Sequence, residues 1–143
     1  MAYNKNEKEL RPFIGILFQI VTCEYFAPLS SPKPKHRNMK NTLDFFKIKD
    51  GELGAVNFNN MIPVNENNYS LVDLNKETLT IAELKYQKLL REQLDWLNAN
   101  YKQVKNKSFK LYQLYSNGKL PENIKARCCN FTLLEEKCIE YNK

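Results

Sequence analysis

The chain has 143 residues, of which 43% are hydrophobic, and this is enough to bury the core of one domain. Its 22 Lys and Arg residues against 16 Asp and Glu give a net charge of +6, which favours an anionic partner but does not identify one. The longest apolar run, residues 12–22, is too short to cross a bilayer, and residues 1–10 lack the layout of a secretory signal, so we expect a cytoplasmic protein without a membrane partner.

The first half of the chain contains six short segments that are rich in β-branched and aromatic residues. These segments are residues 13–21, 24–27, 44–48, 54–58, 61–64 and 70–74. The first is almost continuously apolar, which predicts a strand buried on both faces, and Gly15 within it indicates a bend or a close backbone approach. A turn at residues 49–51 joins the third and fourth segments. Together they predict a small, strongly twisted antiparallel sheet or partial barrel.

After residue 74 the apolar residues follow a helical period. Thr80 and Glu83 have the spacing of a capping box, and one apolar face continues from there to Val104. This pattern predicts one long amphipathic helix. Ser108 is expected to cap a second helix.

The C-terminal part is expected to be helical as well. Residues 117–118, Asn-Gly, are a good left-handed stop for the second helix, and Asn130 is expected to cap a last one. On that last helix the adjacent Glu135 and Glu136 predict a solvated face or a salt bridge at the helix end rather than a metal site. Strands first and helices after them indicate an α+β fold.

The four cysteines do not form a disulfide or zinc pattern. Two of them are adjacent and none makes a CxxC pair; they are Cys23, Cys128, Cys129 and Cys138. We therefore expect reduced thiols, with neither a metal nor a cofactor.

Residues 25–37 combine prolines, hydroxyls, cations and the single histidine. The three prolines between Pro28 and Pro34 fix φ and lack backbone donors, which predicts a stiff extended loop that neither continues a strand nor starts a helix. There is no Asp or Glu between Tyr25 and Leu43, so a phosphate ligand would suit this segment. The cations of this segment are Lys33, Lys35 and Arg37, and Lys40 follows it three positions later.

The same segment contains groups that RNA cleavage through the RNA's own 2′-hydroxyl requires. That reaction needs a proton acceptor, donors or cations for the crowded phosphorane, and help for the leaving 5′-oxygen. The candidates are Ser30, Ser31, Lys33, Lys35, His36 and Arg37. One histidine excludes a mechanism with two histidines. Composition alone favours the alternative, a solvated basic loop whose serines cap backbone groups.

Outside this segment, most lysines and aromatic residues have ordinary structural roles. Lys102, Lys105 and Lys107 are expected mainly to solvate a helix face, with a minority of such lysines contacting an RNA backbone. Tyr25, next to the basic segment, is the aromatic residue that we expect to contact RNA.

Five sequence blocks, in order along the chain, resemble the ToxN/AbiQ family of protein toxins from type III toxin–antitoxin systems. The blocks are residues 11–16, 25–36, 59–63, 70–74 and 130–137, and the most specific are Ala-Pro-Leu-Ser-Ser-Pro-Lys and Asn-Phe-Thr-Leu-Leu-Glu-Glu-Lys. The resemblance implies a metal-independent endoribonuclease that cuts single-stranded RNA, leaving 2′,3′-cyclic phosphate and 5′-hydroxyl ends. It also implies an SH3-like barrel similar to that of the MazF and Kid toxins, with added helices.

The resemblance also implies RNA partners. The antitoxin of the family is an RNA pseudoknot, made as tandem repeats that the toxin processes, and it blocks the active site in a closed protein–RNA assembly. The substrate is cellular or phage mRNA, and some members act in phage abortive infection.

Carried onto this chain, the family's active-site motif falls on residues 30–33. The resemblance assigns Ser31 and Lys33 to the reacting phosphate, with Ser30 and Arg11 in support. The remaining residues assigned to RNA binding are Tyr25, Lys35, His36, Arg37 and Lys40. We expect a single domain over residues 1–143, without the strand and helix that family members carry ahead of the position of Met1. An RNA-binding module that does not cut, and a protein-interaction domain that uses the long helix, are the alternatives.

Overall fold

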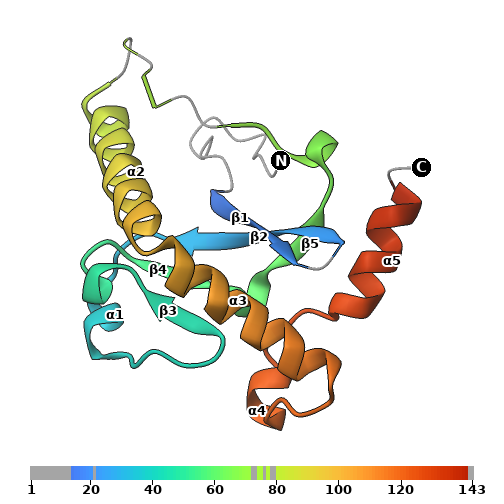
Figure 1. Ribbon diagram of the computed structural model, residues 1–143. Helices are drawn as coiled ribbons and strands as arrows, with labels where there is room; N and C mark the ends of the chain where they lie inside the picture. The colour runs from blue at the N-terminus through green and yellow to red at the C-terminus, as the bar shows by residue number, and fades with distance from the viewer. Residues whose placement is uncertain (1–13, 21, 72–73, 76, 78–79, 142–143) are drawn as a thin grey trace.

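The computed structural model describes residues 14–20, 22–71, 74, 75, 77 and 80–141. Its strands are β1 (Gly15–Ile20), β2 (Cys23–Ser30), β3 (Phe45–Lys47), β4 (Ala55–Asn57) and β5 (Ile62–Val64). Its α-helices are α1 (Pro34–Asn38), α2 (Ile81–Ala99), α3 (Tyr101–Ser116), α4 (Glu122–Lys125) and α5 (Phe131–Tyr141). Figure 1 shows α3 crossing the sheet, α1 beside the β3–β4 turn and α5 beside β5.

Strand β2 is the centre of the sheet. It pairs with β1 from Cys23 to Pro28, and residues 24–26 pair with β5 at the same time. Its last two residues, Leu29 and Ser30, pair with β4, which pairs in turn with β3. All pairs are antiparallel, and the described strands form an open sheet rather than a closed barrel. The expected α+β fold with an antiparallel sheet is confirmed in this open form.

The first expected strand is confirmed as β1, but it is not buried on both faces. Phe18 and Ile20 are buried, whereas Gln19 between them is exposed, so the end of the strand has one buried face. Gly15 does mark a close approach, because a Cβ there would lie 2.5 Å from the carbonyl oxygen of Ala27. Residues 13 and 21, at the two ends of the expected strand, lie outside the described residues.

The last expected strand, residues 70–74, is not observed where the structure describes it. Ser70 and Leu71 belong to no strand, and the Leu71 side chain is 90% exposed. Residues 72 and 73 lie outside the described part of the chain.

The expectation of a stiff proline loop at residues 28–37 is wrong. Strand β2 continues through Pro28 to Ser30, and α1 begins at Pro34. Pro28 lies between the segment of β2 that pairs with β5 and the segment that pairs with β4, so its missing N–H breaks neither of these ladders. Pro34 occupies the first helical position after Lys33, where its fixed φ is favourable and an N–H is not needed.

The long helix predicted from residue 80 is two helices. The capping box is confirmed: Thr80 N–H donates to Glu83 Oε1 and Glu83 N–H donates to Thr80 Oγ1, both at 3.2 Å. The helix ends at Ala99 because Asn100 leaves the helical region, with φ −115° and ψ 20°. Ser108 does not cap a helix; it is buried inside α3, where its hydroxyl donates to the Lys105 carbonyl at 2.7 Å.

The later helix boundaries agree with the sequence. Gly118 adopts the left-handed φ of +68° directly after α3, and the Asn130 side chain accepts from the Leu133 N–H at 3.0 Å. Phe131, the first residue of α5, is buried and lies edge-on to Tyr25 of β2, with ring centroids 5.7 Å apart. This contact fixes the C-terminal helix against the central strand.

We expect Gly54→Ala to destabilise the fold much more than Gly118→Ala, although both glycines have positive φ. A Cβ at Gly54 would lie 1.9 Å from the Ser30 carbonyl oxygen, whereas a Cβ at Gly118 would meet nothing within 4 Å. Gly118→Ala should cost about 1–2 kcal/mol of unfolding free energy, and Gly54→Ala should cost more than about 3 kcal/mol. Urea unfolding measures both, and equal losses would contradict the close approach of β2 to Gly54.

Candidate functional site

A cleft of about 290 Å³ lies where the end of β2, α1 and the loop before β3 meet β4. Its lining is mainly polar and basic. The lining residues are Ser30, Lys33, Lys35, His36, Met39, Lys40, Thr42, Asp44, Phe45, Asn57, Asn59 and Arg127. The cleft therefore brings together five of the residues predicted from the sequence: Ser30, Lys33, Lys35, His36 and Lys40.

Ser30 is held in the cleft from two sides. Its carbonyl oxygen accepts from Gln93 Nε2 of α2 at 3.5 Å, and the same amide donates to the Leu53 carbonyl at 2.8 Å. Its Oγ accepts a hydrogen bond from Asn57 Nδ2 of β4. Because the hydroxyl oxygen is used as the acceptor, the hydroxyl hydrogen remains available to a ligand.

His36 organises the start of α1. The His36 side chain is buried, and its Nδ1 accepts from the Lys33 N–H at 3.2 Å. Burial, followed by the charges of Lys35 and Lys33, lowers the pKa of His36 below its ordinary value, so the ring is neutral at physiological pH. In the neutral ring an accepting Nδ1 leaves the proton on Nε2. His36 can therefore donate from Nε2, but it cannot accept a proton at Nδ1 while the Lys33 contact holds.

The acidic residue in the cleft is paired. Asp44 is 1% exposed, and Arg127 holds it with two hydrogen bonds, Nε to Oδ2 at 3.0 Å and Nη2 to Oδ1 at 2.9 Å. Thr42 and Asn59 also donate to this carboxylate, at 2.8 and 3.2 Å. Burial alone would raise the pKa of Asp44, but the hydrogen bonds from Arg127 and Thr42 outweigh it and hold that pKa below its ordinary value. Because Arg127 compensates its charge, the lysines set the sign of the cleft.

Asn57, Asn59, Asp44 and Arg127 were not predicted as site residues. Asp44 is the first carboxylate after the acid-free stretch, which is the only signal that the sequence offered for it. Arg127 is 83 positions away from Asp44, in the segment between the last two helices that the sequence predicts. Asn59 is the first residue of one of the five sequence blocks described above, whereas no local pattern distinguishes Asn57.

Several predicted residues lie outside the lining of the cleft. Ser31 follows Ser30 directly and is exposed, and Arg37 is exposed on α1. Arg11 lies outside the described residues, so its position relative to the cleft is not part of the structure.

Tyr25 is a core residue, which corrects the expectation that its ring stacks on RNA. The residue is 0% exposed, and its hydroxyl donates to Glu135 Oε2 at 2.6 Å. The Tyr112 hydroxyl donates to the same oxygen at 2.9 Å, so Glu135 joins β2, α3 and α5 rather than forming a solvated face. Burial, together with the bond to Glu135, raises the pKa of both tyrosines. The Tyr25 ring is therefore a structural anchor for α5.

The described residues form neither a metal-binding cluster nor a membrane-spanning helix. Within the described ranges no group of three or more His, Cys, Asp or Glu side chains is arranged to hold a metal ion. No helix in the same ranges is both long enough and apolar enough to cross a membrane. All four cysteines are free thiols, as expected, and burial raises the pKa of Cys128 to about 11.

The chain as a whole matches a known protein family. The family model described as toxin ToxN of the type III toxin–antitoxin system matches residues 1–139. The chain is 34% identical to the endoribonuclease ToxN of Bacillus thuringiensis subsp. kurstaki, over 100% of this chain and 75% of that protein. It is 37% identical to the endoribonuclease ToxN of Pectobacterium atrosepticum, over 93% of this chain and 76% of that protein.

Solved structures share the fold. A structure from work on a processed non-coding RNA that regulates a bacterial antiviral system superposes with a TM-score of 0.73 and 37% identity, covering 92% of this chain and 79% of that one. A second, from work on selective toxin inhibition by a non-coding RNA pseudoknot in type III systems, has a TM-score of 0.69 and 29% identity, covering 99% and 86%.

We expect Arg127→Met to lower the unfolding free energy by about 2–4 kcal/mol near neutral pH, because it leaves the buried Asp44 carboxylate without its cation. The pKa of Asp44 is lowered in the folded chain, so the contribution of the pair is present above the ordinary Asp pKa of about 4 and is lost as the pH falls through the lowered value. The difference between the unaltered and variant chains should therefore shrink below about pH 4.

Arg37→Met is the matched control, because it removes an exposed guanidinium for which the described residues provide no ion pair. It should leave stability almost unchanged. An Arg127→Met penalty that stays constant as the pH falls would mean that Asp44 is not its source.

Proposed function

Because this chain belongs to the ToxN family of endoribonuclease toxins from type III toxin–antitoxin systems, we propose that it cuts single-stranded RNA in the cleft beside Ser30 and Lys33. The cut requires no metal ion and leaves a 2′,3′-cyclic phosphate and a 5′-hydroxyl. The observation that carries this proposal is the grouping of Lys33, Lys35 and Lys40 in one cleft whose carboxylate, Asp44, is already paired with Arg127.

The chemistry follows from the charge that develops at phosphorus. The 2′-hydroxyl loses its proton to a base as its oxygen attacks the adjacent phosphorus, and the intermediate carries extra negative charge on its non-bridging oxygens. The bond from phosphorus to the 5′-oxygen then breaks, and the 5′-oxygen takes up a proton to become the 5′-hydroxyl. The Lys33 ammonium and the hydroxyls of Ser30 and Ser31 are the groups that we assign to the non-bridging oxygens, where preorganised donors and cations are most effective. We assign Arg11 to the same phosphate, in support.

The remaining basic residues hold the strand. Lys35, Arg37 and Lys40 are exposed around the cleft and contact phosphates to either side of the cut. His36 positions Lys33 through its Nδ1 and can donate to the RNA from Nε2. Since it is neutral and donates from that atom, it does not take the proton from the 2′-hydroxyl. That acceptor is a different group.

The partner that restrains this activity is an RNA antitoxin. Both of the solved structures described above come from work on non-coding RNAs, and one concerns inhibition of a toxin by a pseudoknot. An RNA that fills the cleft would be inhibitory because it covers the groups that hold the reacting phosphate. We assign the chain to a closed cytoplasmic protein–RNA assembly with cellular or phage mRNA as the substrate, and to a role in abortive infection.

Ser31→Ala and Lys33→Ala should each lower cleavage of a single-stranded RNA by about 10²-fold or more, because each removes a group that stabilises charge at the phosphate. The assay contains EDTA, and mass spectrometry identifies the ends. Ser70→Ala and Lys119→Ala are the controls, since they remove an exposed hydroxyl and an exposed ammonium outside the cleft. RNA bound without being cut by the unaltered chain would sink the enzyme assignment and favour a non-cutting RNA-binding module.

His36→Ala should lower cleavage about 10-fold, whereas His36→Asn should retain most of it, because an Asn oxygen can replace Nδ1 as acceptor for the Lys33 N–H. The pH profile of cleavage should keep its shape in His36→Asn. Equal losses in both variants, together with the loss of a limb of the profile below the ordinary His pKa of about 6.5, would instead identify His36 as a titrating catalytic group.

A further inference from the structure

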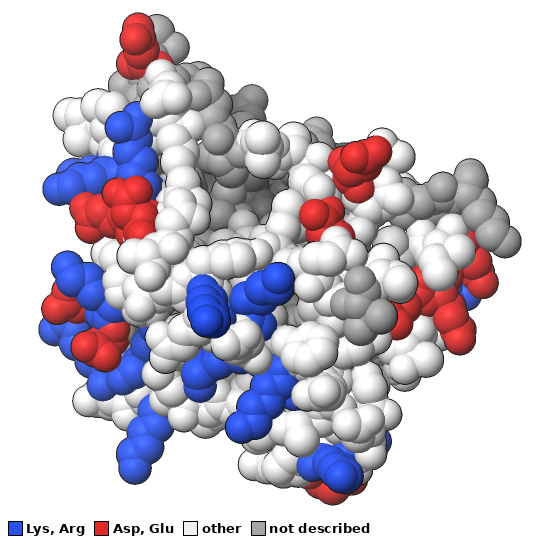
Figure 2. Space-filling model, in the orientation of Figure 1, with Lys and Arg blue, Asp and Glu red and all other residues white. Residues whose placement is uncertain are grey.

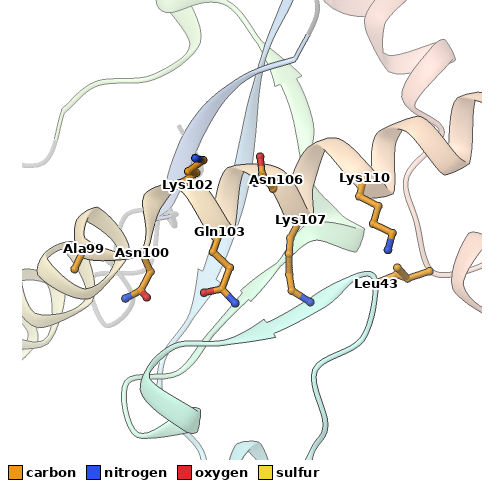
Figure 3. Close-up of a pocket in the computed structure, with 8 residues that line it drawn as sticks. All are labelled: Leu43, Ala99, Asn100, Lys102, Gln103, Asn106, Lys107 and Lys110. Carbon is orange, nitrogen blue, oxygen red and sulfur yellow. The ribbon is translucent and has the colours of Figure 1, made fainter.

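A second hollow, of about 600 Å³, lies between α3 and the loop before β3. Most of its lining comes from one side of α3, which we call the α3 polar face: Lys102, Gln103, Asn106, Lys107 and Lys110. In Figure 3 the side chains of Gln103, Lys107 and Lys110 point from the helix towards this loop, where Leu43 lies. The hollow therefore has a floor of donors and cations and opens to solvent.

The α3 polar face carries positive charge without compensation. The sequence contains no Asp or Glu between Asp95 and Glu122, and no ion pair in the described part of the chain uses a lysine of this face. Lys107 lies over the Phe46 ring, with its Nζ 5.1 Å from the ring centroid, so packing holds this cation at the hollow. Figure 2 shows blue Lys and Arg side chains over the middle of this view, with no red side chain among them.

The hollow adjoins the cleft. Thr42 and Asp44 line the cleft, while Leu43 between them lines the hollow. Consecutive residues of one loop thus line the two sites, so a strand that leaves the cleft over this loop would meet the hollow next. The carboxylate that lines the cleft, Asp44, is buried and paired with Arg127.

We propose that the α3 polar face binds the phosphodiester backbone of the single-stranded RNA on one side of the cleft, which extends the proposed function to a longer track. Lys102 and Lys110 are eight residues apart, about 12 Å along the helix axis, which matches about three phosphates of a stacked strand. The ammonium groups contact phosphates, and the amides of Gln103 and Asn106 hydrogen-bond to sugar or phosphate oxygens. Such contacts add affinity and salt dependence without selecting a base sequence.

The test is the salt dependence of RNA binding by the double variant Lys102→Gln/Lys110→Gln. Both side chains are exposed and have no contact in the described structure that folding depends on. The probes are 2′-O-methyl oligonucleotides of about four and about twelve nucleotides, which cannot be cut through a 2′-hydroxyl. Each lost phosphate contact lowers the slope of log K against log salt by about 0.7 for a single strand, so the double variant should lose about 1.4 of the slope for the longer probe.

The shorter probe separates the track from the cleft. It should bind the double variant as it binds the unaltered chain, because it is held in the cleft alone. The double variant Lys85→Gln/Lys88→Gln makes the same charge change on α2 and should leave the slope for the longer probe within about 0.3 of the unaltered value.

The proposal is overturned if the α3 and α2 double variants lose the same slope, or if the α3 variant weakens both probes equally. These outcomes are distinct from a failure of the proposed function. A chain that cuts no RNA in EDTA but shows the α3-dependent slope contradicts the enzyme assignment and supports the track. A chain that cuts RNA but lacks that slope contradicts the track alone.

Discussion

The position of the cleft depends on the pairing of one strand. Strand β2 pairs with β1 and β5 along its first part and with β4 at Leu29 and Ser30. Because the last pair is the end of the strand, Ser30 is fixed by backbone hydrogen bonds while Ser31 is already exposed beyond the sheet. The Gln93 amide of α2 ties the Ser30 and Leu53 carbonyls together from outside the sheet. The hydroxyls of Ser30 and Ser31, which we propose bind the reacting phosphate, thus lie at the boundary between a paired strand and an accessible surface, as a preorganised site requires.

The charged residues of the cleft fall into an ion pair with a buried carboxylate and a set of exposed lysines. The Asp44 carboxylate is buried at the back of the cleft and is neutralised by Arg127, which joins the segment before α5 to the loop before β3. The cations that have no such partner, among them Lys33 and Lys40, are exposed at the front. A phosphate that contacts exposed lysines stays largely hydrated and is attracted to them, whereas an unpaired carboxylate there would repel it. The ion pair with Arg127 therefore makes Asp44 compatible with the RNA binding that we propose for the cleft.

Local signals in the sequence predicted local structure well. Thr80 with Glu83 and Asn130 marked helix starts because a cap involves residues three positions apart. The prediction of a loop at Pro28 was wrong because a proline disrupts a strand only where the neighbouring strand needs its missing N–H. Which strand faces that nitrogen is set by the sheet and not by the local sequence. The break at Asn100 was hidden because the apolar face continues across it. The Asp44 pair with Arg127 and the Glu135 bonds to two tyrosines join distant segments, and no local pattern encodes them.

Lysine footprinting tests most directly whether RNA occupies the cleft. The purified chain is acetylated with and without a bound 2′-O-methyl single strand, and mass spectrometry gives the labelling rate of each lysine. We predict strong protection of Lys33, Lys35 and Lys40, with no change at Lys119 and Lys137, which are exposed and do not line the cleft. Protection that spares the three cleft lysines while RNA is bound would contradict the account.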